Sequence, residues 1–523
     1  MLAIVLSTVL GLQTASASAG AGQSASAFPV RQVHLDFHTS QWIPEVGTRF
    51  DKAQFQQALK LGHVNWINLF AKCHHSWSYY PTTVGRQHPN LRIDLLGQQI
   101  EACHEIGVRC PFYFTVGWSA TDAQEHPQWC VRNKDGSIAS INWDEKATPG
   151  DRRPVVSWRF LCPGGAYRDL ILRQSEELCR RYPVDGFWYD ITHGPVCYCE
   201  RCREGMAAEG IDFADDAAVS DFNARKWKSF YRAARQLVAK YHPQATVFFN
   251  NTTGLTADNL ERHMFADNTQ QELEDLPTTW GGYDKLALRA KYFHNFDQRI
   301  VAMSGKFHTM WGEFGGFKHP DAIRYEAAAM IAHGVACNFG DQLHPCGEMD
   351  LETYRNIGHA YTYVEQIEAF GIGGKPASRL GVWLSGTPAD DEGVSSMLGK
   401  LYHEHGARLH RDFFANALRR IYRRPMVHTE LPSAGRITLL HQPEQRRYVA
   451  HLLYAPPLQR GHCLVIEDLP ELRDVPVELK VAEKIEKVYK IPGRKALSSD
   501  ASGGAVRVSV PAFTGHCAIV FEY

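Results

Sequence analysis

The 523-residue chain has almost no net charge, with 56 basic against 57 acidic side chains and no charged run that could form a tail. A protein without a surplus of positive charge has no field to attract nucleic acid or an anionic membrane. We therefore expect neither nucleic acid nor a membrane among its partners.

Long apolar runs are also missing. The N-terminal run from Leu2 to Leu12 has about eleven residues, whereas a transmembrane helix needs about twenty. Ala-x-Ala sites at residues 15–17 and 25–27 follow this run, a pattern typical of secretory signal peptides, although the usual basic start is absent. The sequence thus predicts a signal peptide over residues 1–27 and a protein that is secreted or periplasmic.

Internal repeats are absent, so the architecture has to be inferred from single strands and helices. The chain is long enough for one large domain with one or two small modules. Residues 30–370 alternate apolar, strand-like runs with helical patterns, which is typical of a parallel sheet covered by helices. The strand candidates are Gln32–Phe37, Val64–Ala71, Val108–Val116, Gly186–Ile191, Thr246–Asn250, His263–Glu274, His308–Glu313 and Val335–Phe339.

Eight strands separated by helices favour a closed barrel over an open, doubly wound sheet. Two helices are especially clear, at residues 94–106 and Pro320–His333, because Gly107 and Gly334 follow them where a helix C-cap is expected. The fold class we expect is therefore α/β, with a (β/α)8 TIM barrel over residues 28–375.

The pattern changes after residue 374. Residues 376–430 predict a short α/β segment in which Leu380–Gly406 forms one β/α unit. From residue 431 to 523, alternating polar and apolar residues separated by turns predict a small C-terminal β-sandwich.

The loops after the predicted barrel strands contain most of the unusual residue clusters, among them CHHSWSYYP, DITHGP and GDQLHP. In a TIM barrel, the active site lies at the C-terminal ends of the strands, so this clustering predicts an enzyme. Asp190 is the strongest candidate, because it ends the apolar run VDGFWYD and can point at a ligand from the upper rim. The alternative is that Asp190 only caps the following loop.

A retaining glycoside hydrolase needs a nucleophilic carboxylate and a second carboxyl group about 5 Å away as acid/base. Glu272 and Glu274 in QQELEDLP project from one side of an extended strand, because residues two apart share a face. Glu313 in WGEFGG and Asp341 in GDQLHP are the competitors. One of the four is expected to be the acid/base, and the others to bind hydroxyl groups or support the site.

Histidines and tryptophans near the strand ends are candidates for sugar binding. His38, His74 and His75 end the first two strands, and neutral imidazole can both donate and accept hydrogen bonds. Adjacent histidines on a strand point to opposite faces, which argues against one shared metal ion. The remaining candidates are Trp77, Trp118, Trp280 and His344, with the indoles suited to stacking on a sugar ring.

The thirteen cysteines fall into groups. Three form a C-x-C-x-x-C motif, and a fourth in the preceding β/α connection completes the ligand number of a structural zinc ion. Disulfides are the alternative in an exported protein. The predicted zinc ligands are Cys162, Cys197, Cys199 and Cys202. Cysteines within strand or helix patterns are expected to be small buried hydrophobic residues, namely Cys103, Cys110, Cys179 and Cys337.

Four segments resemble the α-L-fucosidases. LDFHTS and AKCHHSWSYYP are similar to the first two strand ends with their sugar-binding histidines, and FWYD to the strand that ends in the nucleophile. QELEDLPTTWGGY is similar to the segment with the acid/base glutamate before a WGY, although the glutamate-to-tryptophan spacing is shorter here. The resemblance implies His38, His74 and His75 as fucose ligands, Asp190 as nucleophile and Glu272 as acid/base, with Glu274 as its rival.

A second resemblance concerns RFLCPGGAYRD and CYCERC, which are similar to the zinc-cluster segments of trimeric β-galactosidases and imply the same four zinc ligands. Those enzymes keep an Asn-Glu pair where Asp190 and Ile191 stand here, which argues against β-galactosidase chemistry. Taken together, these segments resemble those of bacterial α-L-fucosidases whose barrel is followed by a β-galactosidase-type trimerisation domain and a small sandwich. The middle domain is expected to be much shorter here, at residues 376–430. The resemblance therefore does not decide whether the chain forms a homo-oligomer.

The sequence therefore predicts a retaining α-L-fucosidase that releases terminal fucose from a fucosylated oligosaccharide or glycoconjugate. We expect catalysis to need no cofactor, and any zinc ion bound by the four cysteines to be structural. The alternatives are a related exo-glycosidase of the galactosidase type on the same scaffold and a non-catalytic carbohydrate-binding barrel. A binding module could dispense with one of the two carboxylates, whereas this chain retains candidates for both.

Overall fold

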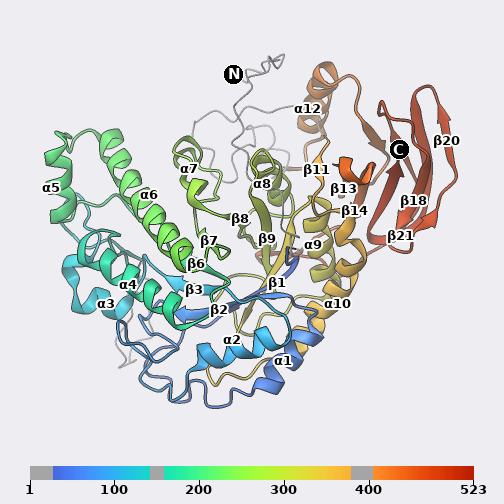
Figure 1. Ribbon diagram of the computed structural model, residues 1–523. Coiled ribbons are helices and arrows are strands. Elements are labelled where there is room, and N and C mark those ends of the chain that lie inside the picture. Colours follow the sequence, from blue (N-terminus) through green and yellow to red (C-terminus); the bar gives the residue numbers. More distant parts are fainter. Residues whose placement is uncertain (1–27, 142–157, 378–404) are drawn as a thin grey trace.

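The computed structural model describes residues 28–141, 158–377 and 405–523 (Figure 1). The predicted signal peptide lies outside the described residues, as does nearly all of the β/α unit predicted over Leu380–Gly406. In the described parts of the chain, no helix combines the length and apolar character needed to cross a bilayer.

Eight parallel strands form the barrel, in the spatial order β7-β6-β3-β2-β1-β10-β9-β8. The sheet closes where β7 and β8 meet, because the backbone N–H of Thr269 donates to the Val247 carbonyl at 2.9 Å. The predicted TIM barrel is thus confirmed. Its strands are β1 (Arg31–Asp36), β2 (Trp66–Lys72), β3 (Phe112–Thr115), β6 (Gly186–Asp190), β7 (Thr246–Phe249), β8 (Gln270–Leu273), β9 (Arg299–Gly305) and β10 (Ala336–Gln342).

One predicted strand is wrong. Residues 308–313 form turns rather than a strand, and the seventh strand of the barrel is β9, which lies earlier in the chain. The buried run IVAMSG of β9 is the continuous apolar pattern of a strand covered on both faces. Glu313 consequently lies in a loop, beyond the strand end to which it was assigned.

Helices surround the barrel (Figure 1). The two helices predicted most clearly are confirmed as α2 and α9, and Gly107 and Gly334 follow them with φ of 74° and 73°, in the left-handed region that favours glycine. The helices are α1 (Lys52–Leu61), α2 (Leu95–Glu105), α3 (Ala120–Glu125), α4 (Gly165–Arg181), α5 (Glu200–Ala208), α6 (Asp216–Tyr241), α7 (Ala257–Glu261), α8 (Lys285–Phe293), α9 (Pro320–Ala332) and α10 (Leu351–Ile367).

The C-terminal part is antiparallel and lies beside the barrel (Figure 1), as the predicted β-sandwich requires. Its long strand β21 pairs with β14 and β18 along its second half and with β17 and β20 along its first half, so one strand joins two sheets around a separate core. Its main strands are β13 (Gly435–Gln442), β14 (Arg447–Tyr454), β17 (Glu471–Leu479), β18 (Lys487–Ile491), β20 (Ser499–Ser502) and β21 (Ala505–Glu522).

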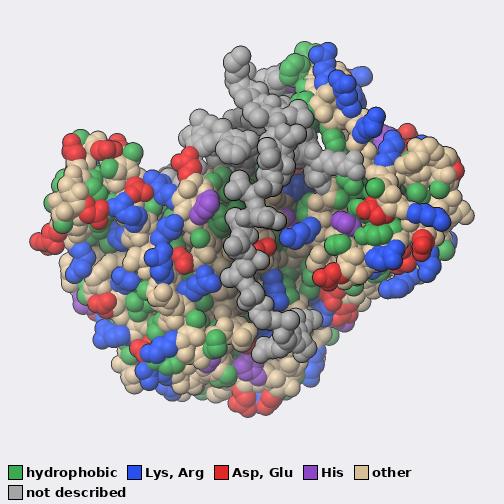
Figure 2. Space-filling model, turned by 45° about the horizontal axis from the view of Figure 1, so that its top comes forward, with side chains coloured by type: hydrophobic (Ala, Val, Ile, Leu, Met, Phe, Trp, Pro, Cys, Tyr) green, Lys and Arg blue, Asp and Glu red, His purple; other side chains and the backbone are tan. Residues whose placement is uncertain are grey.

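Three shorter elements lie between the barrel and this part. Directly after the barrel, β11 (Lys375–Pro376) pairs with β13. Helix α12 (Arg408–Ile421) precedes β12 (Val427–Thr429), which pairs with β17. On the face of the molecule in Figure 2, basic and acidic side chains are interspersed, in keeping with the balanced charge of the sequence.

Strand β6 shows how the barrel positions its chemistry. The Tyr189 hydroxyl donates to Ser175 on α4 at 2.9 Å, so Tyr189 faces the surrounding helices. Because side chains alternate along a strand, Trp188 and Asp190 point into the barrel. Asp190 is the last residue of β6 and therefore lies at the barrel mouth.

Candidate active site

Two carboxyl groups meet at the mouth of the barrel. Asn250, directly after β7, donates from its Nδ2 atom to Asp190 Oδ1 at 2.8 Å and to Glu274 Oε2 at 2.9 Å. Two oxygens bound to one nitrogen lie less than about 6 Å apart, which matches the ~5–5.5 Å separation of a retaining pair and is shorter than an inverting pair requires. The geometry therefore suits double displacement.

Asp190 is held by donors on both oxygens. The Tyr113 hydroxyl of β3 donates to Oδ2, and His74 Nε2 lies 3.5 Å from the same oxygen. Burial raises the pKa of Asp190, while the hydrogen bonds from Tyr113 and Asn250 lower it and favour the carboxylate. An ionised, oriented carboxylate is what a nucleophile requires.

Glu274 has different surroundings. Its second oxygen accepts a hydrogen bond from the Trp311 indole at 2.6 Å. Burial raises the pKa of Glu274, and the neighbouring charge of Asp190 raises it further. A carboxyl group that keeps its proton toward neutral pH can act as a general acid.

Glu272 lies one layer deeper in the barrel. It accepts hydrogen bonds from Trp188 Nε1 at 2.8 Å and Gln270 Nε2 at 2.6 Å, and only 1% of its surface is exposed. Burial raises the pKa of Glu272 to about 7. Of the two glutamates, Glu274 is the one that the structure brings to Asp190, whereas Glu272 is enclosed beneath the site.

His38 and His74 stack at the mouth, with ring centroids 4.0 Å apart. His38 Nε2 lies 3.1 Å from Asp36, and burial holds the pKa of His74 well below its usual value, so that imidazole is neutral. Thr115 donates its hydroxyl hydrogen to the Trp118 carbonyl at 2.6 Å, so His74 Nδ1 must donate to Thr115. His74 Nε2 is left as an acceptor facing Asp190, where it can receive a sugar hydroxyl.

Aromatic rings extend the site beyond the histidines. Trp118 lies 5.1 Å from the His74 ring and stacks on Trp158 at 5.7 Å. Trp158 also lies 5.3 Å from His75, whose pKa burial lowers to about 4. These two indoles form an apolar wall beside the carboxylate pair.

The structure gives the other predicted residues different partners. Glu313 accepts from the backbone N–H groups of His308 and Thr309 and so stabilises its own loop. Asp341 pairs in register with Leu35 and lies 3.6 Å from Lys306, on the outward face of β10. The remaining three lie in surrounding loops: Trp77 beside His88, Trp280 in the turn after β8, and His344 exposed beside Phe314.

Several residues of the site were missed by the sequence interpretation. Tyr113 lies inside an apolar strand, and nothing in the sequence marks it as functional. Asn250 could have been found, because it ends the strand-like run TVFFN as Asp190 ends its own. The position of Trp311 depends on a contact between distant segments and could not be predicted. Its ring packs so closely on Gly340 of β10 that a Cβ atom there would come within 2.5 Å of it. The others missed are Asp36 and Trp158.

Backbone strain accompanies the strand ends that carry the site. The residues just after His75, Asp190 and Asn250 all have left-handed backbone angles, with φ of 80° at Ser76, 49° at Ile191 and 69° at Asn251. Such angles are uncommon for residues other than glycine and are unfavourable for β-branched isoleucine. Strain of this kind persists where the surrounding structure fixes a functional geometry.

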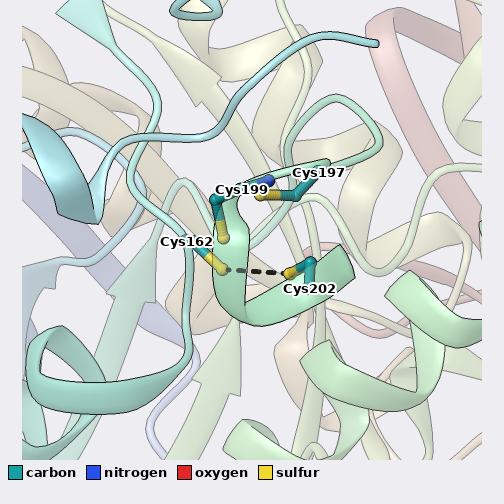
Figure 3. A group of neighbouring side chains, drawn as sticks. All are labelled: Cys162, Cys197, Cys199 and Cys202. Atoms are coloured by element: carbon teal, nitrogen blue, oxygen red, sulfur yellow. Dashed lines mark hydrogen bonds between the residues drawn. The ribbon is translucent and has the colours of Figure 1, made fainter. Parts of the chain in front are cut away.

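The four cysteines predicted as zinc ligands lie together. Their sulfur atoms are within 4.8 Å of one another, and those of Cys162 and Cys202 are 3.7 Å apart (Figure 3). Cys162 precedes α4 and the other three surround the start of α5. All thirteen cysteines are free. The ammonium group of Lys226 lies 3.2 Å from Cys202 Sγ, where it offsets the negative charge of thiolates.

Comparisons with known proteins find similarity to glycoside hydrolases. A family model described as hypothetical glycosyl hydrolase 6 matches residues 51–191, a range that includes His74 and Asp190. The structure of α-L-fucosidase isoenzyme 2 from Paenibacillus thiaminolyticus is similar to the chain with a TM-score of 0.84 and 29% identity, covering 95% of this chain and 100% of that chain. The likeness drawn from the sequence motifs is thus confirmed over nearly the whole chain.

Two other structures are more remote. The α-fucosidase of Thermotoga maritima in complex with fucose gives a TM-score of 0.48 at 12% identity, covering 90% of this chain and 79% of that chain. An α-L-fucosidase of Bacteroides thetaiotaomicron gives a TM-score of 0.49 at 13% identity, covering 91% and 83%. No curated protein matches the chain.

Proposed function

We propose that the chain is a glycoside hydrolase that releases terminal α-L-fucose with retention of configuration. The observation that carries this proposal is the Asn250 amide shared by Asp190 and Glu274, because it holds two carboxyl groups at the separation of a retaining pair. The overall likeness to an α-L-fucosidase at 29% identity supports the choice of sugar.

In the first step, Asp190 attacks the anomeric carbon and the bond to the leaving oxygen breaks, while Glu274 donates its proton to that oxygen. The product of this step is a fucosyl ester of Asp190. In the second step, Glu274 removes a proton from water, the water oxygen attacks the anomeric carbon, and the ester bond breaks. Asp190 is restored as a carboxylate and Glu274 as an acid. No cofactor takes part.

The residues around the pair are suited to holding the sugar. His38 and His74 provide polar ring atoms for hydroxyl groups, and the indoles of Trp118 and Trp158 provide an apolar surface for the ring face or the methyl group of fucose. The natural substrate is then a fucosylated oligosaccharide or glycoconjugate.

The four cysteines are proposed to bind a structural zinc ion. Four thiolates suit tetrahedral zinc, and the cluster packs within a small hydrophobic core that includes Ile191, the residue after the nucleophile. Zinc bound there supplies no chemistry to the reaction, but it fixes the loop that follows Asp190.

Export remains a proposal that rests on the first 27 residues of the sequence. Expression of the full chain in a bacterial host, followed by fractionation and N-terminal sequencing of the product, tests it. A mature N-terminus near residue 28 outside the cytoplasm supports export, and an intact Met1 in the cytoplasm contradicts it.

A panel of nitrophenyl glycosides that differ only in the sugar tests the function. The fucosidase proposal expects rapid hydrolysis of the α-L-fucoside with the α-anomer released first, as followed by NMR. Preference for a galactoside would assign the galactosidase alternative, and binding of fucose without hydrolysis of any member would assign a carbohydrate-binding barrel.

A further inference from the structure

A second group of metal-ligating side chains lies at the opposite end of the barrel. His104 is in the last turn of α2, Cys110 precedes β3, and Asp185 precedes β6. Because β6 runs from Gly186 to Asp190, Asp185 and Asp190 mark the two ends of one strand. The group therefore lies at the bottom of the barrel, away from the catalytic pair.

The three ligand atoms are already gathered. His104 Nε2 lies 2.8 Å from Asp185 Oδ2 and 3.5 Å from Cys110 Sγ, and all three atoms are within 4.8 Å of one another. Around tetrahedral zinc, with bonds of about 2.0–2.3 Å, ligand atoms are about 3.3–3.8 Å apart. The nitrogen–sulfur distance already fits this range, and the nitrogen–oxygen distance has to widen by about half an ångström.

The surroundings favour this geometry. The backbone N–H of Cys110 donates to Asp185 Oδ2 at 2.8 Å, which fixes the carboxylate beside the thiol. The side chains of His104 and Asp185 are 35% and 23% exposed, so an ion can reach them from solvent. Cys110 is fully buried, which keeps the sulfur on the inner side of the group.

We propose that His104, Cys110 and Asp185 bind a zinc ion, with a water molecule as the fourth ligand. Nitrogen and sulfur donors suit zinc, whereas magnesium and calcium prefer oxygen ligands alone. The ion ties α2 to the beginnings of β3 and β6 and so stabilises the base of the barrel. Cys110, expected from the sequence to be a plain hydrophobic residue, acquires a ligand role.

Zinc content tests the proposal. The full-length protein and its variants are dialysed against the same dilute zinc buffer and analysed for bound metal. We expect His104→Gln and Cys110→Ser each to hold one zinc ion per chain fewer than the unmodified protein. Cys179→Ser, in helix α4, is the control, because Cys179 is also a buried thiol but belongs to no such group among the described residues. Its zinc content should stay unchanged.

A second measurement covers variants that fold poorly. His104 is partly exposed, so His104→Gln should fold, and zinc should raise the unfolding temperature of the unmodified protein more than that of this variant. Cys199→Ser should lose the zinc ion of the four-cysteine group instead. It should keep the rise in unfolding temperature that zinc binding at His104 causes. The proposal is overturned if the unmodified protein and His104→Gln bind the same amount of zinc and show the same rise in unfolding temperature with zinc. The group would then be only a His104–Asp185 ion pair.

Discussion

Asp190 and Glu274 accept hydrogen bonds from one nitrogen atom, Nδ2 of Asn250. A side-chain amide has two N–H donors, so it can serve both carboxyl groups at once and fix the distance between them. The remaining oxygens have different partners, a tyrosine hydroxyl for Asp190 and an indole N–H for Glu274. The pair is thus asymmetric, which allows one member to be ionised while the other keeps its proton.

Asp190→Ala should lose nearly all turnover while the protein stays folded, because the proposed nucleophile is removed from a preformed barrel. Added azide should restore part of the activity on nitrophenyl α-L-fucoside, since the small anion can occupy the space of the missing carboxylate. Rates with and without azide, together with a circular dichroism spectrum, check this. Full activity of a folded Asp190→Ala would contradict the assigned role.

Asn250→Ala should shift the pH profile of activity to higher pH and lower its maximum. The hydrogen bonds from Asn250 lower the pKa of both Asp190 and Glu274, so their loss raises both values. Activity needs ionised Asp190 and protonated Glu274, and therefore the acid limb and the alkaline limb both move up. The measurement is kcat/KM against pH. Asn251→Gly, at the next position with φ of 69°, is the control and should leave both limbs in place.

The structure explains why parts of the site were predictable. Asp190 could be found because a carboxylate at the end of an apolar barrel strand lies at the barrel rim whatever the details of packing. The sequence could not predict which of Glu272 and Glu274 lies beside Asp190, because residues two apart on a strand share a face and differ only in depth. Depth is set by where β8 ends, and the strand is shorter than the predicted His263–Glu274.

Other parts depend on contacts between distant segments. Trp158 lies beside Trp118 across 40 residues of chain, and Trp311 reaches Glu274 from a loop that was predicted as a strand. Local hydrophobic pattern carries no information on either contact. The group of four cysteines, in contrast, was predictable because three of its members lie close together in the sequence.

Removal of metal from the four-cysteine site should destabilise the protein without acting directly on catalysis. Cys199→Ser should lose one zinc ion per chain and unfold at a lower temperature, because structural zinc couples its binding to folding. Residual kcat at a temperature where the variant is folded should stay close to the original. Elemental analysis and thermal unfolding check this, with Cys179→Ser as the control. Metal-free protein with these four cysteines paired as disulfides would contradict a zinc site.

A buried histidine pair should make stability fall in mild acid. His451 Nδ1 and His516 Nε2 lie 3.0 Å apart where the C-terminal sheet meets the barrel, with Tyr363 of α10 bonded to His516 at 2.9 Å. Burial lowers the pKa of His451 to about 4 and that of His516 well below its usual value. Their stabilising contribution is therefore complete above the unfolded pKa near 6.5 and is lost as pH falls from there toward the folded values.

Each histidine that stays neutral in the folded state costs up to about 1.4 kcal/mol of unfolding free energy per pH unit in this window. His451→Gln should be less stable at pH 8 but lose less stability between pH 7 and pH 5 than the unmodified protein. His462→Gln, an exposed histidine of the same domain, is the control. Urea unfolding at several pH values gives the slopes, and equal slopes for His451→Gln and the unmodified protein would contradict the prediction.

The final prediction separates Glu274 from Glu272 by the leaving group. Glu274→Ala removes the proposed proton donor, and general acid catalysis contributes about 10²–10⁴-fold. The loss in kcat/KM should therefore be large on fucosyl oligosaccharides and small on a dinitrophenyl fucoside, whose leaving group departs without a proton. Glu272 is enclosed below the site and bonded to Trp188, so Glu272→Gln should change both substrates by the same modest factor. If only the Glu272 variant shows dependence on the leaving group, the acid/base role passes to Glu272, and Asn250 then positions the nucleophile alone.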